Sequence, residues 1–179
     1  MKNSLECFIG KVQSGSGNYK YLNLTEEELV EVGGIRNVYN LATTFLGGKV
    51  SICVCRNRTF EFVHLTTPDN VTSIKTNGLL PISSGVYALG EGLYLANNQD
   101  LHSFSNLQMW ATSNIRSDEL SLIYGRYVGH YLECIYPSDK QGFILVNDVI
   151  EPKHFTKIVD SIRLEDFLNI TRVDLMIKR

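Results

Sequence analysis

The chain has 179 residues, of which 44% are hydrophobic and 20% charged, a composition typical of a globular domain with a core of its own. Its 17 Lys and Arg against 19 Asp and Glu give a net charge of −2. This balance offers no electrostatic argument for nucleic acid or an anionic membrane as the main partner. The short run Cys55–Arg58 is the candidate for a local basic patch.

The sequence contains no run with the pattern of a signal peptide or a membrane span, so we expect a cytoplasmic protein without a membrane partner. Cysteines in that compartment are usually reduced thiols. We therefore expect free thiols at four positions, namely Cys7, Cys53, Cys55 and Cys134. Cys53 and Cys55 are two residues apart on a predicted strand and would share one face of it.

The first half of the chain carries several local structural signals. Thr25 and Glu28 have the spacing of a capping box and predict a helix that ends at the following glycine pair. Between Gly48 and His64, two strand-like runs flank the polar sequence RNR and predict a β-hairpin. Thr67 is the expected N-cap of a short helix that ends at Gly78.

The second half predicts a short strand at LYLA, a helix over 100–112 and two buried strands at 126–136 and 142–150. Both faces of 126–136 are apolar, which is typical of a central strand. We predict an α+β fold and one domain, 1–179. Within it, residues 1–58 would form a helical and hairpin extension packed on a core of residues 59–179.

Three short motifs carry the functional signal. A strand-like run ends in His64-Leu65-Thr66, the following helix ends in Asn77-Gly78-Leu79, and a loop closes in Gly90-Glu91-Gly92-Leu93-Tyr94-Leu95-Ala96. Each motif alone has an ordinary structural explanation, such as a histidine bonded to backbone or a tyrosine in the core. In this order and spacing the chain resembles the ADP-ribosyltransferase catalytic domains of the diphtheria-toxin and poly(ADP-ribose) polymerase type.

That resemblance implies a small split mixed β-sheet that binds NAD+ as co-substrate, with no metal. His64 would hold a ribose hydroxyl and Tyr94 would stack on the nicotinamide ring. The backbone of Leu65 would hold the carboxamide. The other residues implied in NAD+ binding are Thr66, Tyr87, Gly92, Ser103 and Ser105. The histidines at 64, 102, 130 and 154 lack metal-ligand spacing, in agreement with a metal-free site.

The chain departs from the family at the third catalytic position. Members usually place a glutamate at the start of a late strand, where this sequence has Phe143 or Gly142, with Gln141 as the nearest polar residue and candidate substitute. Three nearby acidic residues do not fit the position without a shift of register, namely Glu133, Asp148 and Glu151. The resemblance therefore implies transfer of single ADP-ribose units rather than polymer synthesis.

We expect a mono-ADP-ribosyltransferase that acts on a protein, nucleic-acid or small-molecule acceptor in a toxin, defence or counter-defence setting. The missing glutamate leaves a second hypothesis open, an inactive binding module for a protein, NAD+ or ADP-ribose. A related NAD+-dependent RNA 2′-phosphotransferase is less favoured, because the sequence shows no Arg/His phosphate cluster. The sequence indicates neither the acceptor nor the oligomeric state.

Overall fold

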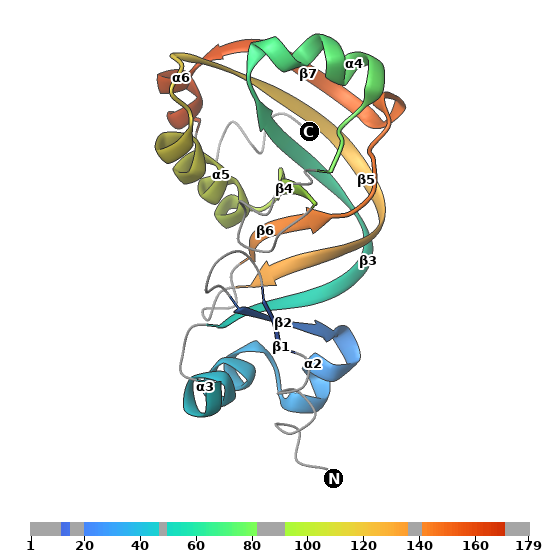
Figure 1. Ribbon diagram of the computed structural model, residues 1–179, viewed down its shortest axis with the longest axis vertical. Coiled ribbons are helices and arrows are strands. Elements are labelled where there is room, and N and C mark those ends of the chain that lie inside the picture. The colour runs from blue at the N-terminus through green and yellow to red at the C-terminus, as the bar shows by residue number, and fades with distance from the viewer. Residues whose placement is uncertain (1–11, 15–19, 47–49, 82–91, 136–140, 171–179) are drawn as a thin grey trace.

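The computed structural model describes residues 12–14, 20–46, 50–81, 92–135 and 141–170 (Figure 1). The strands in these ranges are β1 (Val12–Ser14), β2 (Lys20–Thr25), β3 (Val50–Thr66), β4 (Leu93–Asn97), β5 (Glu119–Ile135), β6 (Gln141–Val146) and β7 (Phe155–Arg163). The helices are α2 (Glu26–Val32), α3 (Ile35–Leu46), α4 (Val71–Asn77), α5 (Leu101–Asn114) and α6 (Leu164–Leu168). Two 3₁₀ turns, η1 (Pro68–Asn70) and η2 (Pro152–His154), complete the set.

The strands in the described ranges form one mixed sheet in the order β1-β2-β3-β4-β6-β5-β7, with a further pairing between β3 and β5. Strands β2 and β3 are parallel, and the other pairs are antiparallel. Because β3 pairs with both β4 and β5, the strands β3, β4, β6 and β5 close into a ring. Figure 1 shows β3 and β5 as long curved strands that extend along most of the molecule. The fold is therefore mixed α+β.

The main core lies inside this ring, where all four strands contribute alternate side chains. Its buried members are Phe60, Phe62, Leu79, Leu93, Leu95, Ile123, Tyr127, Tyr131, Ile144, Val146 and Ile150. On the outer face, α5 and α6 pack against β3 and β5 through Phe104, Ala111 and Phe167. At the other end α2 and α3 cover β2 and the start of β3 (Figure 1).

The predicted hairpin between Gly48 and His64 is wrong, because one continuous strand, β3, runs through the RNR sequence. Residues 56–58 have Cα partners in β5 at Tyr131, His130 and Gly129. The polar run reads locally as a turn, but its arginines meet carboxylates that come from elsewhere in the chain. The proposed boundary after residue 58 falls inside β3, so the N-terminal extension and the core share this strand.

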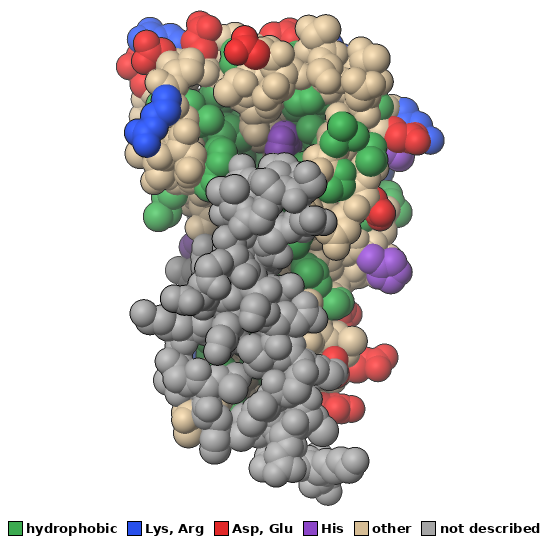
Figure 2. Space-filling view, viewed as in Figure 1, with side chains coloured by type: hydrophobic (Ala, Val, Ile, Leu, Met, Phe, Trp, Pro, Cys, Tyr) green, Lys and Arg blue, Asp and Glu red, His purple; other side chains and the backbone are tan. Residues whose placement is uncertain are grey.

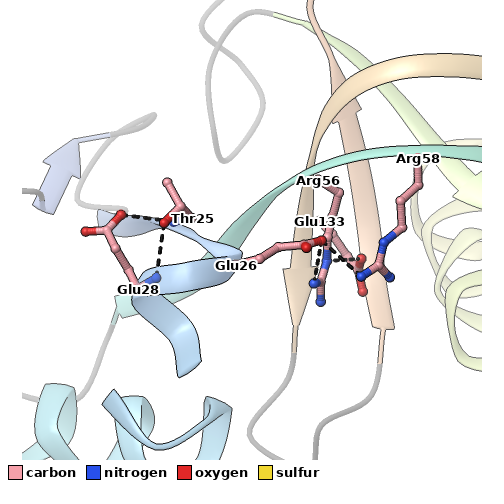
Figure 3. Close-up of polar contacts among 6 residues, drawn as sticks. All are labelled: Thr25, Glu26, Glu28, Arg56, Arg58 and Glu133. Atoms are coloured by element: carbon pink, nitrogen blue, oxygen red, sulfur yellow. Dashed lines mark hydrogen bonds and ion pairs between the residues drawn. The ribbon is translucent and has the colours of Figure 1, made fainter. Parts of the chain in front are cut away.

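Figure 3 shows the ion pairs that hold the RNR sequence in the sheet. Arg56 donates from Nε to Glu133 on β5 (3.1 Å) and from Nη1 to Glu26 on α2 (2.9 Å). Arg58 Nη2 reaches the same Glu26 oxygen at 3.0 Å. The hydrogen bond from Arg56 lowers the pKa of Glu26, with the charges of both arginines acting in the same direction. Since both arginines are paired, the expected basic patch at Cys55–Arg58 is neutralised.

Several locally signalled elements are confirmed. The Thr25–Glu28 capping box opens α2 with reciprocal bonds of 3.1 and 3.0 Å (Figure 3). Helix α5 starts after Asp100, whose carboxylate caps it, and LYLA lies in β4. Strand β5 is central as predicted, but it starts at Glu119.

The expected helix after β3 differs in its detail. The segment divides into the turn η1 and the helix α4, and Thr67 makes no capping bond with its side chain. Gly78 ends α4 with φ +81°, as the sequence predicts.

Candidate functional site

The three strands that carry the predicted catalytic positions are neighbours in the sheet. His64 lies on β3, Tyr94 on β4 and Phe143 on β6, and β4 is paired between the other two. The Cα partner of Tyr94 on β6 is Leu145. Segments separated by 30 residues and more in sequence are thus brought to adjacent positions of one sheet (Figure 1).

His64 contacts the tyrosine strand directly. Its Nδ1 lies 3.2 Å from the carbonyl oxygen of Tyr94. A carbonyl oxygen only accepts, so Nδ1 carries the hydrogen and donates it, which leaves Nε2 as the acceptor of the ring. Burial lowers the pKa of His64, and the bond to Tyr94 opposes this in part. The result is a partly exposed, neutral imidazole whose free nitrogen lone pair can receive a hydroxyl hydrogen.

Around His64, β3 is paired with a neighbouring strand along one of its two edges. The pairing with β4 includes Phe62 and Val63, whereas the pairing with β5 continues to Thr66. Among the strands that the structure describes, residues 64–66 therefore have a partner on the β5 side alone. This geometry is compatible with the predicted use of Leu65 backbone groups, although the Leu65 side chain is buried in the outer core.

Thr66 lies two residues beyond His64, on the same side of β3. Its hydroxyl accepts a hydrogen bond from Nδ2 of Asn70 at 3.2 Å, and the same amide bonds Thr67. The Thr66 side chain is buried. Its hydroxyl hydrogen remains available to a neighbouring acceptor, so the predicted orienting role stays a prediction with suitable chemistry.

The aromatic side chain of Tyr94 points away from the core enclosed by strands β3, β4, β6 and β5. Its neighbours Leu93 and Leu95 belong to the inner core, so alternation places Tyr94 on the outer face. The same alternation places His64, two residues after Phe62, on the inner face, so the side chains of His64 and Tyr94 point to opposite faces of the sheet. On the outer face, the Tyr94 ring lies 5.5 Å from that of Phe143, centroid to centroid, with the planes tilted by 41°. The pair packs on a small buried cluster of Cys53, Cys134 and Leu145. Tyr94 is partly buried, with one part of its ring held by the protein.

The position expected for the family's glutamate is apolar. Phe143 is partly buried against Tyr94, and Gln141 is the first residue of β6, opposite Ile135. The Gln141 side chain lies outside the described part of the structure. Glu133 is the Cα partner of Ile144, but its carboxylate is bound to Arg56. It faces the interior side with Ile144 and not the outer face with Phe143.

The remaining predicted residues lie around the ends of β4. Gly92 has φ +144°, and a Cβ there would lie 2.3 Å from Cδ1 of Leu145, so the site requires glycine for steric reasons. Ser103 is buried, and its hydroxyl accepts from the backbone N–H of Asn97 at 2.8 Å. Ser105 is exposed on α5. Tyr87 lies outside the described residues.

Sequence reasoning did not single out a cavity of about 240 Å³ on another part of the sheet. Its lining residues are Glu61, Phe62, Asn98, Tyr124, Gly125, Thr156 and Lys157. None of the predicted NAD+-binding residues belongs to this lining. Glu61 lies in a predicted strand, whereas Tyr124 precedes the predicted strand 126–136, and the contact of both with β7 depends on long-range pairing.

Charge and metal-ligand chemistry are sparse in the described ranges. Within them, no cluster of three His, Cys, Asp or Glu side chains could hold a metal ion. On the face shown in Figure 2, the Lys and Arg side chains of these ranges lie towards the margins, and hydrophobic side chains are exposed between them. None of the described helices has both the length and the apolar character to cross a membrane.

Comparison with known proteins adds no relative. No protein-family model, curated protein or solved structure matches the chain.

Proposed function

We propose that this protein is a mono-ADP-ribosyltransferase, which cleaves NAD+ at the bond between nicotinamide and ribose and transfers ADP-ribose to an acceptor. The observation that carries the proposal is that β3, β4 and β6 are neighbours, with His64 bonded to the backbone carbonyl of Tyr94 at the end of β3 and the Tyr94 ring packed on Phe143. The co-substrate would extend around this strand end, because His64 and the Tyr94 ring lie on opposite faces of the sheet. Two of the motifs that the resemblance selects, those of His64 and Tyr94, and the position of the missing glutamate lie on neighbouring strands. A chance resemblance of short motifs gives no reason for that adjacency.

In this proposal, His64 positions the co-substrate. Its Nε2 accepts a hydrogen bond from a ribose hydroxyl, while the carbonyl oxygen of Tyr94 fixes the tautomer through Nδ1. A neutral ring suits this role, because the nicotinamide ribose gains positive charge as the bond breaks. The burial that lowers the pKa of His64 keeps a competing positive charge away from it.

Tyr94 supplies the aromatic surface. The nicotinamide ring of NAD+ is flat and positively charged, so it is attracted to the face of a tyrosine. Phe143 holds the Tyr94 ring at 5.5 Å and limits its rotation. Departure of neutral nicotinamide leaves an electron-poor ribose carbon, and the nucleophile of the acceptor forms the new bond there.

Phe143 in place of an acid makes the proposed activity weak. A phenyl ring stabilises developing positive charge far less than a carboxylate does, and it cannot remove a proton from the acceptor. The same observation favours a second candidate, a non-catalytic module that binds NAD+ or ADP-ribose on this surface. The two candidates share the binding site and differ in whether the glycosidic bond breaks.

One experiment separates them. Purified protein is incubated with NAD+ labelled in the adenylate part and with a lysate that contains protein and nucleic acid, and label on macromolecules and released nicotinamide are measured. We expect label on one class of acceptor and at least a tenfold loss with His64→Ala. The matched control is His130→Ala, since His130 is an exposed histidine on β5. Equal labelling by both variants would contradict the proposal. Saturable NAD+ binding without nicotinamide release would establish the binding module instead.

A further inference from the structure

Two thiols meet beneath the candidate site. Cys53 on β3 and Cys134 on β5 are direct Cα partners in the antiparallel pair, and their Sγ atoms lie 2.8 Å apart. Directly opposed residues of antiparallel strands have Cα atoms about 4.5–5.5 Å apart, which lies within the range that disulfides span. The strands therefore hold both thiols in position for a covalent bond without a change of register.

We propose that Cys53 and Cys134 are a site of reversible cross-linking, in which a peroxide converts the two thiols into a disulfide between β3 and β5. One thiolate attacks a peroxide oxygen, the O–O bond breaks, and a sulfenic acid forms as hydroxide leaves and takes up a proton. The second thiol loses its proton and attacks that sulfur, which expels a second hydroxide as water. With hydrogen peroxide, two thiols are oxidised, and one peroxide is reduced to two waters.

The packing around Cys53 and Cys134 favours oxidation by a small peroxide over exchange with a bulky disulfide reagent. Cys53 and Cys134 are 0% and 4% exposed and pack against Leu145, Leu132 and the Tyr94–Phe143 pair. A mixed disulfide with a tripeptide-sized partner has no room in such a cluster. A sulfenic acid adds a single oxygen atom to a site whose second thiol is already in contact.

The reaction is expected to be slow at neutral pH and faster in alkali. The hydrogen bond to Cys53, burial and the nearby charge of Glu133 all raise the pKa of Cys134. Arg56 is bound to Glu133 and offsets part of that charge, and Tyr94 is the remaining titratable group packed on the cluster. Cys55, exposed two residues away on the same strand, should react first with any soluble oxidant or alkylating reagent.

The cross-link would tie together two strands of the closed ring. Its ends are 81 residues apart in sequence, so the bond restricts the unfolded chain strongly. For a chain of this length a rise in Tm of roughly 10 °C is expected. Because the new bond is read as a covalent product, the test does not depend on the proposed transferase activity.

The test uses the full chain with Cys55→Ser, treated with hydrogen peroxide at about pH 6 and about pH 9. Remaining thiols are alkylated after denaturation, and unreduced peptides are mapped by mass spectrometry. We expect a peptide pair joined through Cys53 and Cys134, more at the higher pH, and its loss on reduction with a thiol.

Cys53→Ala and Cys134→Ala should each eliminate the joined pair and the rise in Tm. Full alkylation of both residues after peroxide at the higher pH would overturn the proposal. So would over-oxidation of either residue to sulfinic acid without a cross-link. The mapping of the Cys55→Ser protein decides the matter even if an alanine variant fails to fold.

Discussion

The Nδ1 atom of His64 lies 3.2 Å from the carbonyl oxygen of Tyr94, so the two residues that the sequence motifs single out are joined by a hydrogen bond. The contact links β3 to β4 just beyond the point where their regular pairing stops at Val63. It fixes the imidazole by a backbone group, which does not depend on the identity of a neighbouring side chain. This explains how a positioning histidine can be held rigidly at the end of a strand.

The first prediction concerns acid stability. The pKa of His64 is lowered in the folded state, so between its unfolded value near 6.5 and the lower folded value the unfolded chain binds more protons. The free energy of unfolding should therefore fall as pH drops through about 6.5, until the folded pKa is reached. Tm measured from about pH 8 to about pH 5 should decline less in His64→Ala than in His130→Ala. Parallel curves for the two variants would contradict the lowered pKa of the half-buried His64.

A second prediction separates packing from ligand binding at Tyr94. Tyr94→Ala removes a partly buried ring from its contact with Phe143 and should lower the free energy of unfolding by about 2 kcal/mol. It should also eliminate NAD+ binding measured by calorimetry. Tyr94→Phe keeps the ring and should retain most of both properties. If the alanine variant folds and binds NAD+ with unchanged affinity, Tyr94 does not stack on nicotinamide.

The third prediction tests the missing acid. Phe143 contacts Tyr94 from the adjacent strand, so Phe143→Glu places a carboxylate beside the proposed nicotinamide ribose. Release of nicotinamide from NAD+ should rise about tenfold or more over the parent chain. Phe143→Gln is the matched control, because glutamine has nearly the same shape as glutamate without its charge. Equal rates for the Glu and Gln variants would show that position 143 does not face the reacting bond.

A fourth prediction uses two glycines with positive φ. Gly92→Ala puts a methyl group 2.3 Å from Cδ1 of Leu145, whereas a Cβ at Gly34 meets nothing within 4 Å. Both substitutions strain the backbone, at φ +144° and +97°. Urea denaturation should show a loss of about 1 kcal/mol for Gly34→Ala and about 3 kcal/mol for Gly92→Ala. A similar loss at both positions would mean that Leu145 moves aside without cost.

The fifth prediction addresses the ion pairs of β3. Arg56→Met leaves the carboxylate of Glu133 buried without its partner, and the free energy of unfolding should fall by about 3 kcal/mol. Adding Glu133→Gln to the same chain removes the unpaired charge and should recover a large part of that loss. Chemical denaturation of the two chains provides the comparison. The absence of any recovery would place the effect in packing rather than in charge.

Much of the local structure follows from the sequence alone. The predicted features depend on neighbours within a few residues or on one periodic pattern: the capping box at Thr25 and Glu28, the helical pattern of α5, the glycine end of α4 and the central character of β5. Such signals act before the chain collapses, so they can be recognised without knowledge of the fold. The motifs that contain His64 and Tyr94 belong to the same class of local pattern.

Tertiary structure alone decided the features that depend on distant partners. From the sequence alone, residues 56–58 look like a turn. In the structure Arg56 is paired with Glu26 and Glu133, which are 30 and 77 residues away, and the strand is continuous. The contact of Cys53 with Cys134 and that of Tyr94 with Phe143 likewise arise from strand order. The order of the strands depends on which faces of the sheet are buried by distant elements. A short window of sequence does not contain those distant elements. The sequence by itself therefore determined which residues resemble a catalytic site, and the closed ring of strands decided which of them meet.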